Sequence, residues 1–210
     1  MSTTWRQRAS RVFNAPNRRE LELAYDRWAE NYDDDHANFG WPLLVHFVAL
    51  FCRHVPLDAS PILDAGAGTG RVAQYLVPHG YRGLVGIDLS GQMLEVARRK
   101  AVYDELHRMT LGQALDFADH HFAAVASCGA MSPGHAGADA FDELIRVTRP
   151  DGLLVLSMRS GAEAVTGFAR RCRELEDEGR WRLVDEIPHF VSHPELDPPL
   201  TYGIHVFRVS

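Results

Sequence analysis

ILDAGAGTGR, residues Ile62 to Arg71, joins an apolar run to three glycines at alternate positions and leads directly into a helical pattern. Glycine accepts a positive φ and lets a ligand approach the backbone without meeting a Cβ. In a strand, loop and helix unit, the loop lies at the carboxyl end of the strand, where open α/β sheets bind their ligands. We therefore expect this loop to bind a cofactor that contains a nucleoside.

Short apolar runs alternate with helical periods after Pro56. Such alternation predicts a doubly wound α/β fold, in which helices cover both faces of a mostly parallel sheet. The expected strands are Pro61–Ala65, Leu84–Asp88, Arg108–Leu111, Phe122–Ser127, Leu153–Met158, Trp181–Ile187 and Ile204–Val209. The expected helices between them are Arg71–Val77, Gln92–Ala101, Ala138–Thr148 and Ala162–Glu178. The Pro-rich stretch 188–199 is expected to be a surface excursion.

The residues before the first strand divide into two parts. Residues 1–19 carry five arginines and little periodic hydrophobicity, which is typical of a flexible basic arm. Residues 20–55 predict a helical cap, since they contain a stripe of large side chains at helical spacing and a proline suited to the first turn of a second helix. These residues are Leu21, Tyr25, Trp28, Tyr32 and Pro42. Residues 56–210 are then expected to form the cofactor-binding domain.

The composition excludes several classes of protein. The 210 residues are 46% hydrophobic and 24% charged, which is typical of a globular domain and not of a disordered chain. A formal net charge of −6 argues against a dedicated nucleic-acid binder. The longest apolar stretch, Trp41 to Phe51, is too short to span a membrane, and the first residues contain no apolar signal core. Three scattered cysteines favour a cytoplasmic protein without disulfides or a zinc cluster.

Two aspartates flank the glycine loop and indicate which nucleoside cofactor it binds. Asp88 ends the second expected strand, where a carboxylate can accept hydrogen bonds from both ribose hydroxyls. Asp64 precedes the loop, where it would repel a pyrophosphate and attract the ammonium group of S-adenosylmethionine. Arg71 stands where the dinucleotide motif GxGxxG needs its last glycine. These features favour S-adenosylmethionine over a nicotinamide dinucleotide.

The same residues resemble the motifs of a known family. Asp64 to Gly70 is similar to motif I of the class I S-adenosylmethionine-dependent methyltransferases, and Gly86 to Ser90 is similar to their second motif. The chain from about Leu21 onward resembles members named after the Williams–Beuren syndrome region. The resemblance implies a Rossmann-like sheet of seven strands in the order 3-2-1-4-5-7-6, with the last strand antiparallel.

Cofactor contacts are expected from both motifs and from three further segments. Gln113 stands where family members carry an acid for the adenine amino group, and its carbonyl oxygen can still accept a hydrogen bond. The resemblance also implies that a Tyr hydroxyl of the cap reaches the carboxylate tail of the cofactor. After methyl transfer the cofactor is expected to leave as S-adenosylhomocysteine. The expected contact residues are Tyr25, Tyr32, Asp64, Ala65, Gly66, Gly68, Asp88, Leu89, Met93, Gln113, Ala114 and Cys128.

The methyl acceptor is expected beside the carboxyl end of the fourth strand, where the sequence from Cys128 to His135 reads CGAMSPGH. Methyl transfer from a sulfonium needs aligned reactants, and it needs a general base only when the acceptor must lose a proton. His135 is the candidate base in this segment, although a solvated loop histidine is the commoner finding. The segment lacks the Asn/Asp-Pro-Pro-aromatic motif of the family's nucleic-acid members. We therefore expect a small-molecule O, N or S acceptor.

Two alternatives stay open at this point. One is an NAD-dependent oxidoreductase, against which Asp64 and Arg71 argue. The other is a non-catalytic protein that binds S-adenosylmethionine, because binding and catalytic residues coincide in this chemistry. No metal is expected, since His120 and His121 lack a third ligand at metal spacing. The sequence leaves the oligomeric state open.

Overall fold

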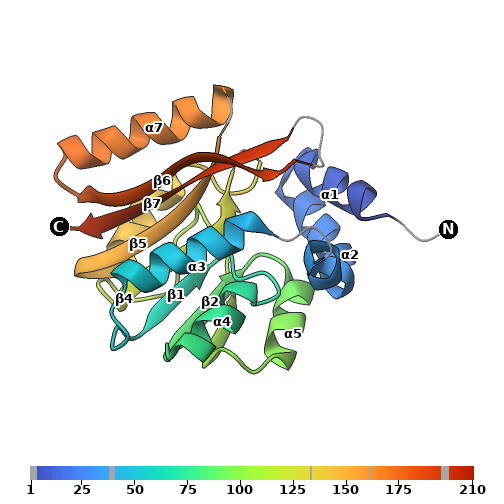
Figure 1. Ribbon diagram of the computed structural model, residues 1–210, viewed down its shortest axis with the longest axis horizontal. Coiled ribbons are helices and arrows are strands. Elements are labelled where there is room, and N and C mark those ends of the chain that lie inside the picture. The colour runs from blue at the N-terminus through green and yellow to red at the C-terminus, as the bar shows by residue number, and fades with distance from the viewer. Residues whose placement is uncertain (1–3, 38–40, 133, 161, 195–198) are drawn as a thin grey trace.

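The computed structural model describes residues 4–37, 41–132, 134–160, 162–194 and 199–210, with the backbone alone at 162–166. Its elements are α1 (Trp5–Phe13), α2 (Arg18–Ala37), α3 (Pro42–His54), β1 (Ile62–Ala65), α4 (Arg71–Leu76), η1 (Val77–His79), β2 (Leu84–Asp88), α5 (Gly91–Arg99), β3 (Glu105–Arg108), β4 (Phe122–Met131), α6 (Ala140–Val147), β5 (Thr148–Ser160), α7 (Ala162–Asp177), β6 (Trp181–His193) and β7 (Leu200–Val209). Figure 1 shows helices on both sides of a central sheet, with α1 and α2 together at one end. Within the described ranges, every helix is too short or too polar to cross a bilayer.

The seven strands form one sheet in the order β3-β2-β1-β4-β5-β7-β6. Strands β1 to β5 run parallel, and β7 lies antiparallel to both β5 and β6. The predicted fold class and strand order are therefore confirmed. The strand order reverses between β1 and β4, and in open α/β sheets the crevice at such a point binds the ligand.

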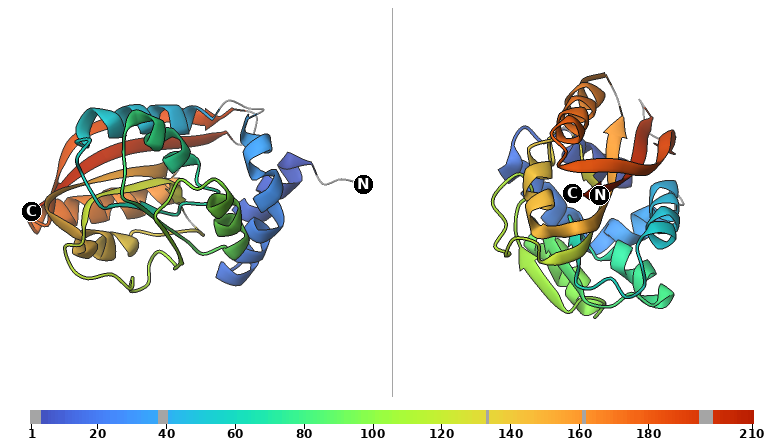
Figure 2. Two further views of the ribbon diagram at one scale, coloured as in Figure 1. Left: turned by 90° about the horizontal axis from the view of Figure 1, so that it is seen from below. Right: turned by 90° about the vertical axis from the view of Figure 1, so that its left-hand side faces the viewer.

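Alternate strand residues supply two separate cores. Ile62 and Val155 pack with residues of α3 and α4, whereas Leu63 and Leu154 pack with residues of α6 and α7. The right-hand view of Figure 2 shows these helices on opposite faces of the sheet. Strands buried on both faces are apolar almost throughout. The buried carboxylate of Asp64 in β1 is therefore an exception that needs a reason.

The amino-terminal segment differs from its expected arrangement in two ways. Most of the expected flexible arm is the helix α1, which begins with a capping box at Thr4 and buries Ala9 and Val12 in one cluster with residues of α2. The apolar side of α1 is too short to show a helical period in the sequence. The second expected cap helix, α3, covers the sheet instead, with Phe47 and Phe51 fully buried. The cap therefore consists of α1 and α2.

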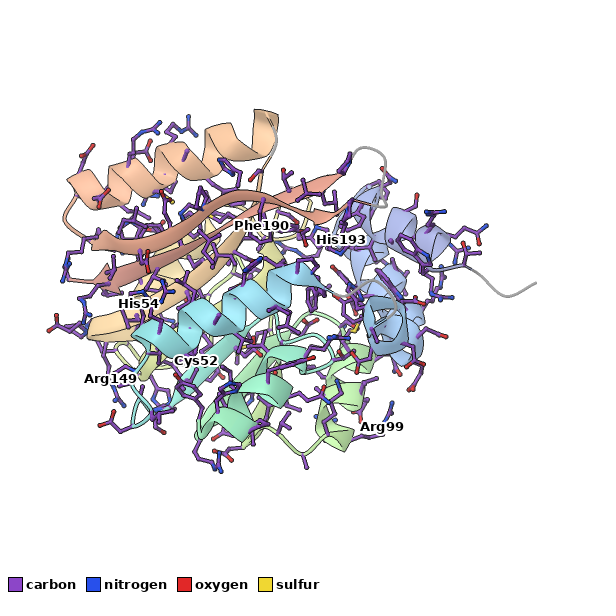
Figure 3. All side chains as sticks on the ribbon, in the orientation of Figure 1. Cys52, His54, Arg99, Arg149, Phe190 and His193 are labelled. Atoms are coloured by element: carbon purple, nitrogen blue, oxygen red, sulfur yellow. The ribbon has the colours of Figure 1, made fainter. Side chains whose placement is uncertain are left out.

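Several strands also differ from their predicted bounds: β4, β5 and β7 are longer than predicted, β3 is shifted and β6 is extended. β3 ends at Arg108, where the predicted strand began, because this partly exposed edge strand needs no continuous apolar run. β6 continues through Pro188 to His193, into the stretch expected to be a surface excursion, while 195–198 lie outside the described residues. Proline is tolerated here because β6 is an edge strand that pairs with β7 alone. His193 brings the end of β6 to the cap, with its ring 6.1 Å from that of His36 (Figure 3).

Candidate functional site

A cavity opens at the carboxyl ends of β1, β2 and β4, with α2 along one wall. It contains about 690 Å³ of space, its open mouth included. This is the position predicted for the ligand. The expected site residues that line it are Tyr25, Tyr32, Gly66, Gly68, Asp88, Leu89, Met93, Cys128 and His135.

The glycine loop forms the floor of the cavity through its backbone. Gly66 and Gly68 have φ values of 87° and 54°, a region that L side chains rarely adopt. The Gly66 N–H donates to the Ile87 carbonyl oxygen at 2.9 Å, which ties the loop to the end of β2. A Cβ on Gly66 would lie 2.6 Å from the Ala130 Cβ, whereas one on Gly68 would meet nothing within 4 Å. Gly66 is therefore required by packing, and Gly68 leaves the backbone open to a ligand.

Asp88 lies at the end of β2 and lines the cavity, as predicted. Its carboxylate accepts hydrogen bonds from the backbone N–H groups of Gly68 and Ser90, each at 2.8 Å. Burial raises the pKa of Asp88 to about 6, although these backbone donors oppose the shift. A carboxylate has about four lone-pair sites, so Asp88 keeps acceptor capacity for the hydroxyls of a ligand.

Asp64 lies behind the cavity wall, 1% exposed. Its Oδ2 accepts a hydrogen bond from the Tyr103 hydroxyl at 2.6 Å, whereas its buried Oδ1 has no protein donor within the described part of the chain. Burial raises the pKa of Asp64 to about 7, and the nearby charge of Asp88 adds to the shift. Burial, and then the charge of Asp64, also raises the pKa of the Cys128 thiol on the cavity wall. A buried acceptor without a donor is costly, and a cationic ligand would supply one.

The apolar side of the cavity is formed by the start of α5 and by the residues that follow β3. Leu89 and Met93 lie there as expected, and they are joined by Met109 and Leu111, which the sequence did not indicate as contacts. Gln113 and Ala114 are exposed and lie outside the lining. The difference follows from the earlier end of β3, which places 109–111 at the strand's carboxyl end instead of 113–114.

Helix α2 supplies the wall opposite the loop. Burial raises the pKa of Tyr25 and of Tyr32 well above the usual value, so both hydroxyls stay protonated and can donate to a ligand. The same helix contributes Arg18 and Leu21, which were not predicted as site residues. Leu21 belongs to the predicted stripe with Tyr25, and this shared helical face is the signal that could have identified it.

Two aspartates hold α2 against the glycine loop and α5. The Asp26 carboxylate accepts from the Ser90 hydroxyl at 2.6 Å and from the Gln92 N–H at 3.2 Å. The Asp33 carboxylate accepts from the Thr69 hydroxyl at 2.6 Å. These bonds connect the cap to the glycine loop and to the start of α5, which both border the cavity. The position of the cap therefore depends on the segments that also form the floor of the cavity.

The loop after β4 places His135 on the cavity wall. Its Nδ1 lies 3.0 Å from the hydroxyl oxygen of the buried Ser132, which restrains the ring. The His135 ring also packs against the rings of Phe13 and Tyr25, at centroid distances of 6.2 and 5.7 Å. His135 is therefore a restrained residue of the cavity wall and not a solvated loop histidine.

Comparisons with known proteins agree with this arrangement. The family model described as a methyltransferase domain matches residues 62–152, which run from β1 into β5. The human protein named methyltransferase-like protein 27 is 38% identical over 170 residues, which cover 75% of this chain and 66% of that protein. The chain belongs to the class I S-adenosylmethionine-dependent methyltransferases.

Other members support the family and its fold. A malonyl-[acyl-carrier protein] O-methyltransferase of Enterobacter lignolyticus is 34% identical over 156 residues, which cover 73% of this chain and 57% of that protein. This methyltransferase chain thus spans about three fifths to two thirds of the length of these two relatives. The crystal structure of a TehB-like methyltransferase from Corynebacterium glutamicum superimposes with a TM-score of 0.64 at 20% identity. That match covers 87% of this chain and 98% of the other, and it shows the shared fold.

The cavity of this methyltransferase fits the family cofactor, S-adenosylmethionine. Asp88, which lines the cavity, suits a ribose diol, and Asp64, directly behind the wall, supplies a negative charge that suits the ammonium group of the amino-acid tail. The apolar side around Met93 and Leu111 suits the adenine ring, and the open face of Gly68 admits a close approach. Both acids oppose a pyrophosphate at the same place.

Proposed function

We propose that this chain transfers a methyl group from S-adenosylmethionine to an O, N or S atom of a small molecule. The observation that carries the proposal is the pair of carboxylates on either side of the glycine loop, Asp64 fully buried and Asp88 half-buried in the cavity wall. A cationic nucleoside without phosphate is the family ligand that pairs with both. The bound cofactor supplies a methyl group on positively charged sulfur, which is already activated for displacement by a lone pair.

The chain's own residues bind, orient and exclude water. Asp88 holds the ribose, Asp64 holds the ammonium group, and the α2 tyrosines close the cavity above them. His135, restrained by Ser132, accepts the proton of an acceptor that must lose one. Restraint of both reactants in a closed site is the main contribution that a protein makes to this reaction.

An oxygen acceptor is supported by one relative. The Enterobacter lignolyticus protein is named for O-methylation of a malonyl group on acyl-carrier protein. The described residues offer His135 as a base, which an alcohol acceptor needs and a carboxylate does not. We therefore place oxygen acceptors first among the acceptors to be tested.

Calorimetric titration with S-adenosylmethionine, S-adenosylhomocysteine and NAD tests the cofactor. We expect the two sulfur nucleosides to bind at micromolar concentration and NAD to show no heat of binding. Transfer of labelled methyl groups to a panel of alcohols, carboxylic acids, amines and thiols then tests the reaction. NAD binding at the same site would contradict the proposal, and tight S-adenosylmethionine binding without transfer to any acceptor would instead support a non-catalytic binding protein.

A further inference from the structure

Arg159 lies at the carboxyl end of β5, next to the segment where the acceptor is expected. It is the neighbour of Tyr202 across the antiparallel pair β5 and β7, so the two side chains share one face of the sheet. One residue earlier, Met158 pairs with Met131 of β4, directly before the loop that carries Ser132 and His135. Arg159 therefore belongs to the same end of the sheet as the acceptor side of the cavity.

The guanidinium of Arg159 has no anionic partner within the part of the chain that the structure describes. Seven arginines of the chain are partly buried, and six of them donate to a carboxylate or carbonyl oxygen: Arg8, Arg71, Arg146, Arg171, Arg180 and Arg208. Among the described residues, Arg159 makes neither an ion pair nor a hydrogen bond through its side chain. A partly buried arginine in this state retains five donors for a ligand.

The residues around Arg159 orient its guanidinium but accept no hydrogen bond from it within the described residues. Its guanidinium carbon lies 5.4 Å from the centroid of the Phe13 ring. Stacking on an aromatic ring holds the guanidinium plane and leaves the N–H groups on its edge available. Burial raises the pKa of Tyr202 to about 12, and the positive charge of Arg159 opposes this shift.

Phe13 connects Arg159 to the cavity. The same ring packs against His135, which lines the cavity, so the guanidinium and the candidate base both contact one aromatic ring. Arg159 itself lines a second cavity, together with Met158 and Phe168. A fork of parallel N–H donors is the arrangement that matches a carboxylate in two hydrogen bonds.

We propose that Arg159 is the anchor for an anionic acceptor, a small organic acid whose carboxylate pairs with the guanidinium while its nucleophilic atom lies beside His135. This inference rests on the proposed function, whose acceptor class it narrows. Arg159 determines acceptor affinity and takes no part in binding the cofactor.

The test measures binding of acids and of their amides to protein saturated with S-adenosylhomocysteine. The probes are 3-hydroxybenzoate, benzoate, malonate and succinate, each with the corresponding primary amide, and binding is followed by saturation-transfer NMR. We expect at least one acid to bind tenfold or more tightly than its amide. Arg159→Gln should remove this preference, a loss of about tenfold or more, and should leave S-adenosylhomocysteine affinity within threefold of the wild type.

Arg149→Gln is the matched control, because Arg149 is an exposed arginine near the opposite end of the same strand (Figure 3). It should keep the preference for the acid. With an acceptor that is turned over, Arg159→Gln should raise KM and leave kcat nearly unchanged. Equal binding of acids and amides, no binding of any acid, or an unchanged preference in Arg159→Gln would each overturn the inference. Failure of the proposed function is a separate result, since it appears as absence of S-adenosylhomocysteine binding.

Discussion

At the expected cofactor end of the cavity most polar groups come from one stretch of chain, Asp64 to Ser90, joined by tyrosines of α2 and by Tyr103. The expected acceptor end is assembled from four distant segments. The first end is held by backbone groups: the Asp88 carboxylate accepts from two N–H groups, and the loop is bound to the end of β2. The second end consists of side chains of α1, the loop after β4, and strands β5 and β7, in contact mainly through rings.

This difference assigns separate tasks to the two ends. Backbone hydrogen bonds depend little on which side chains surround them, so the cofactor end can stay constant while the acceptor end varies. Ring contacts leave room for substitution, which allows the acceptor to change without loss of the fold. Changes at one end should therefore alter cofactor affinity, and changes at the other should alter acceptor use or stability alone.

The largest expected effect is that of Asp88→Ala on cofactor affinity. The change removes the acceptor for the ribose hydroxyls and leaves the Gly68 and Ser90 N–H groups without their partner. We expect S-adenosylhomocysteine binding to weaken by about 1–3 kcal/mol, or roughly 5- to 150-fold, in calorimetry. Asp116→Ala, at an exposed aspartate, should have no effect. Unchanged affinity in Asp88→Ala would remove this residue from the site.

A smaller effect is expected from pH. Burial raises the pKa of Asp64 to about 7 and of Asp88 to about 6. Because these raised values favour the protonated acids, the free protein loses their contribution to stability as pH rises from about 4 through about 7. The ligand binds the ionised acids, so affinity for S-adenosylhomocysteine should increase by about tenfold or more between pH 5.5 and 7.5.

Asp64→Asn separates the two acids. This variant cannot ionise at position 64, so its affinity should be lower at pH 7.5 and should depend on pH through Asp88 alone. Calorimetry at four or five pH values measures both curves. A wild-type affinity that stays flat or falls over this range would show that the ligand does not depend on either ionised carboxylate.

Arg8→Ala tests the acceptor end through the attachment of α1. Arg8 donates to both oxygens of the buried Asp35, at 2.8 and 2.7 Å, and Trp28 of α2 shares that carboxylate. We expect the free energy of unfolding in urea to fall by about 1.5 kcal/mol, the usual contribution of hydrogen bonds to a charged group. Arg11→Ala, at an exposed arginine of the same helix, should change it little. A large loss of S-adenosylhomocysteine affinity in Arg8→Ala would contradict the separation of the two ends.

The same contrast explains how far the sequence could predict the molecule. The glycine loop and Asp88 were predictable because their signal is local: an apolar run, glycines at alternate positions and an acid at the next strand end. The core strands were predictable because burial on both faces requires apolar residues. β3 and the end of β6 differ from prediction because edge strands lack that requirement, and the earlier end of β3 places residues 109–111, instead of Gln113, in the cavity lining.

The acceptor end could not be predicted from local patterns. Phe13, His135, Arg159 and Tyr202 meet only after the sheet has formed, and no periodicity relates them. The sequence predicts a flexible arm where α1 lies, because the buried side of this helix is formed by only a few residues, among them Ala9 and Val12. The sequence also does not indicate Tyr103 as a partner of Asp64, because 39 positions separate the two residues in the chain and only the folded sheet brings them together.

Tyr103→Phe is expected to have the smallest effect, and it tests whether the cofactor end depends on this one distant residue. The Tyr103 hydroxyl donates to Asp64 at 2.6 Å and stabilises the ionised form of that acid. Without it, the pKa of Asp64 should rise further, and the pH midpoint of S-adenosylhomocysteine binding should move upward. At pH 7 the loss should be about 0.5–1.5 kcal/mol, or roughly 2- to 12-fold.

The pH dependence distinguishes this electrostatic role from simple packing. The ring of Tyr103 remains in Tyr103→Phe and keeps its position beside Gly70 and Gly86. The loss of affinity should therefore shrink as pH rises and Asp64 ionises in both proteins, which a packing defect would not do. Tyr75→Phe, at an exposed tyrosine, provides the control. If Tyr103→Phe lowers affinity equally at every pH, the hydroxyl supports the shape of the loop and not the charge of Asp64. The charge at the cofactor end would then depend only on residues of the glycine-loop motif and its neighbouring strand end.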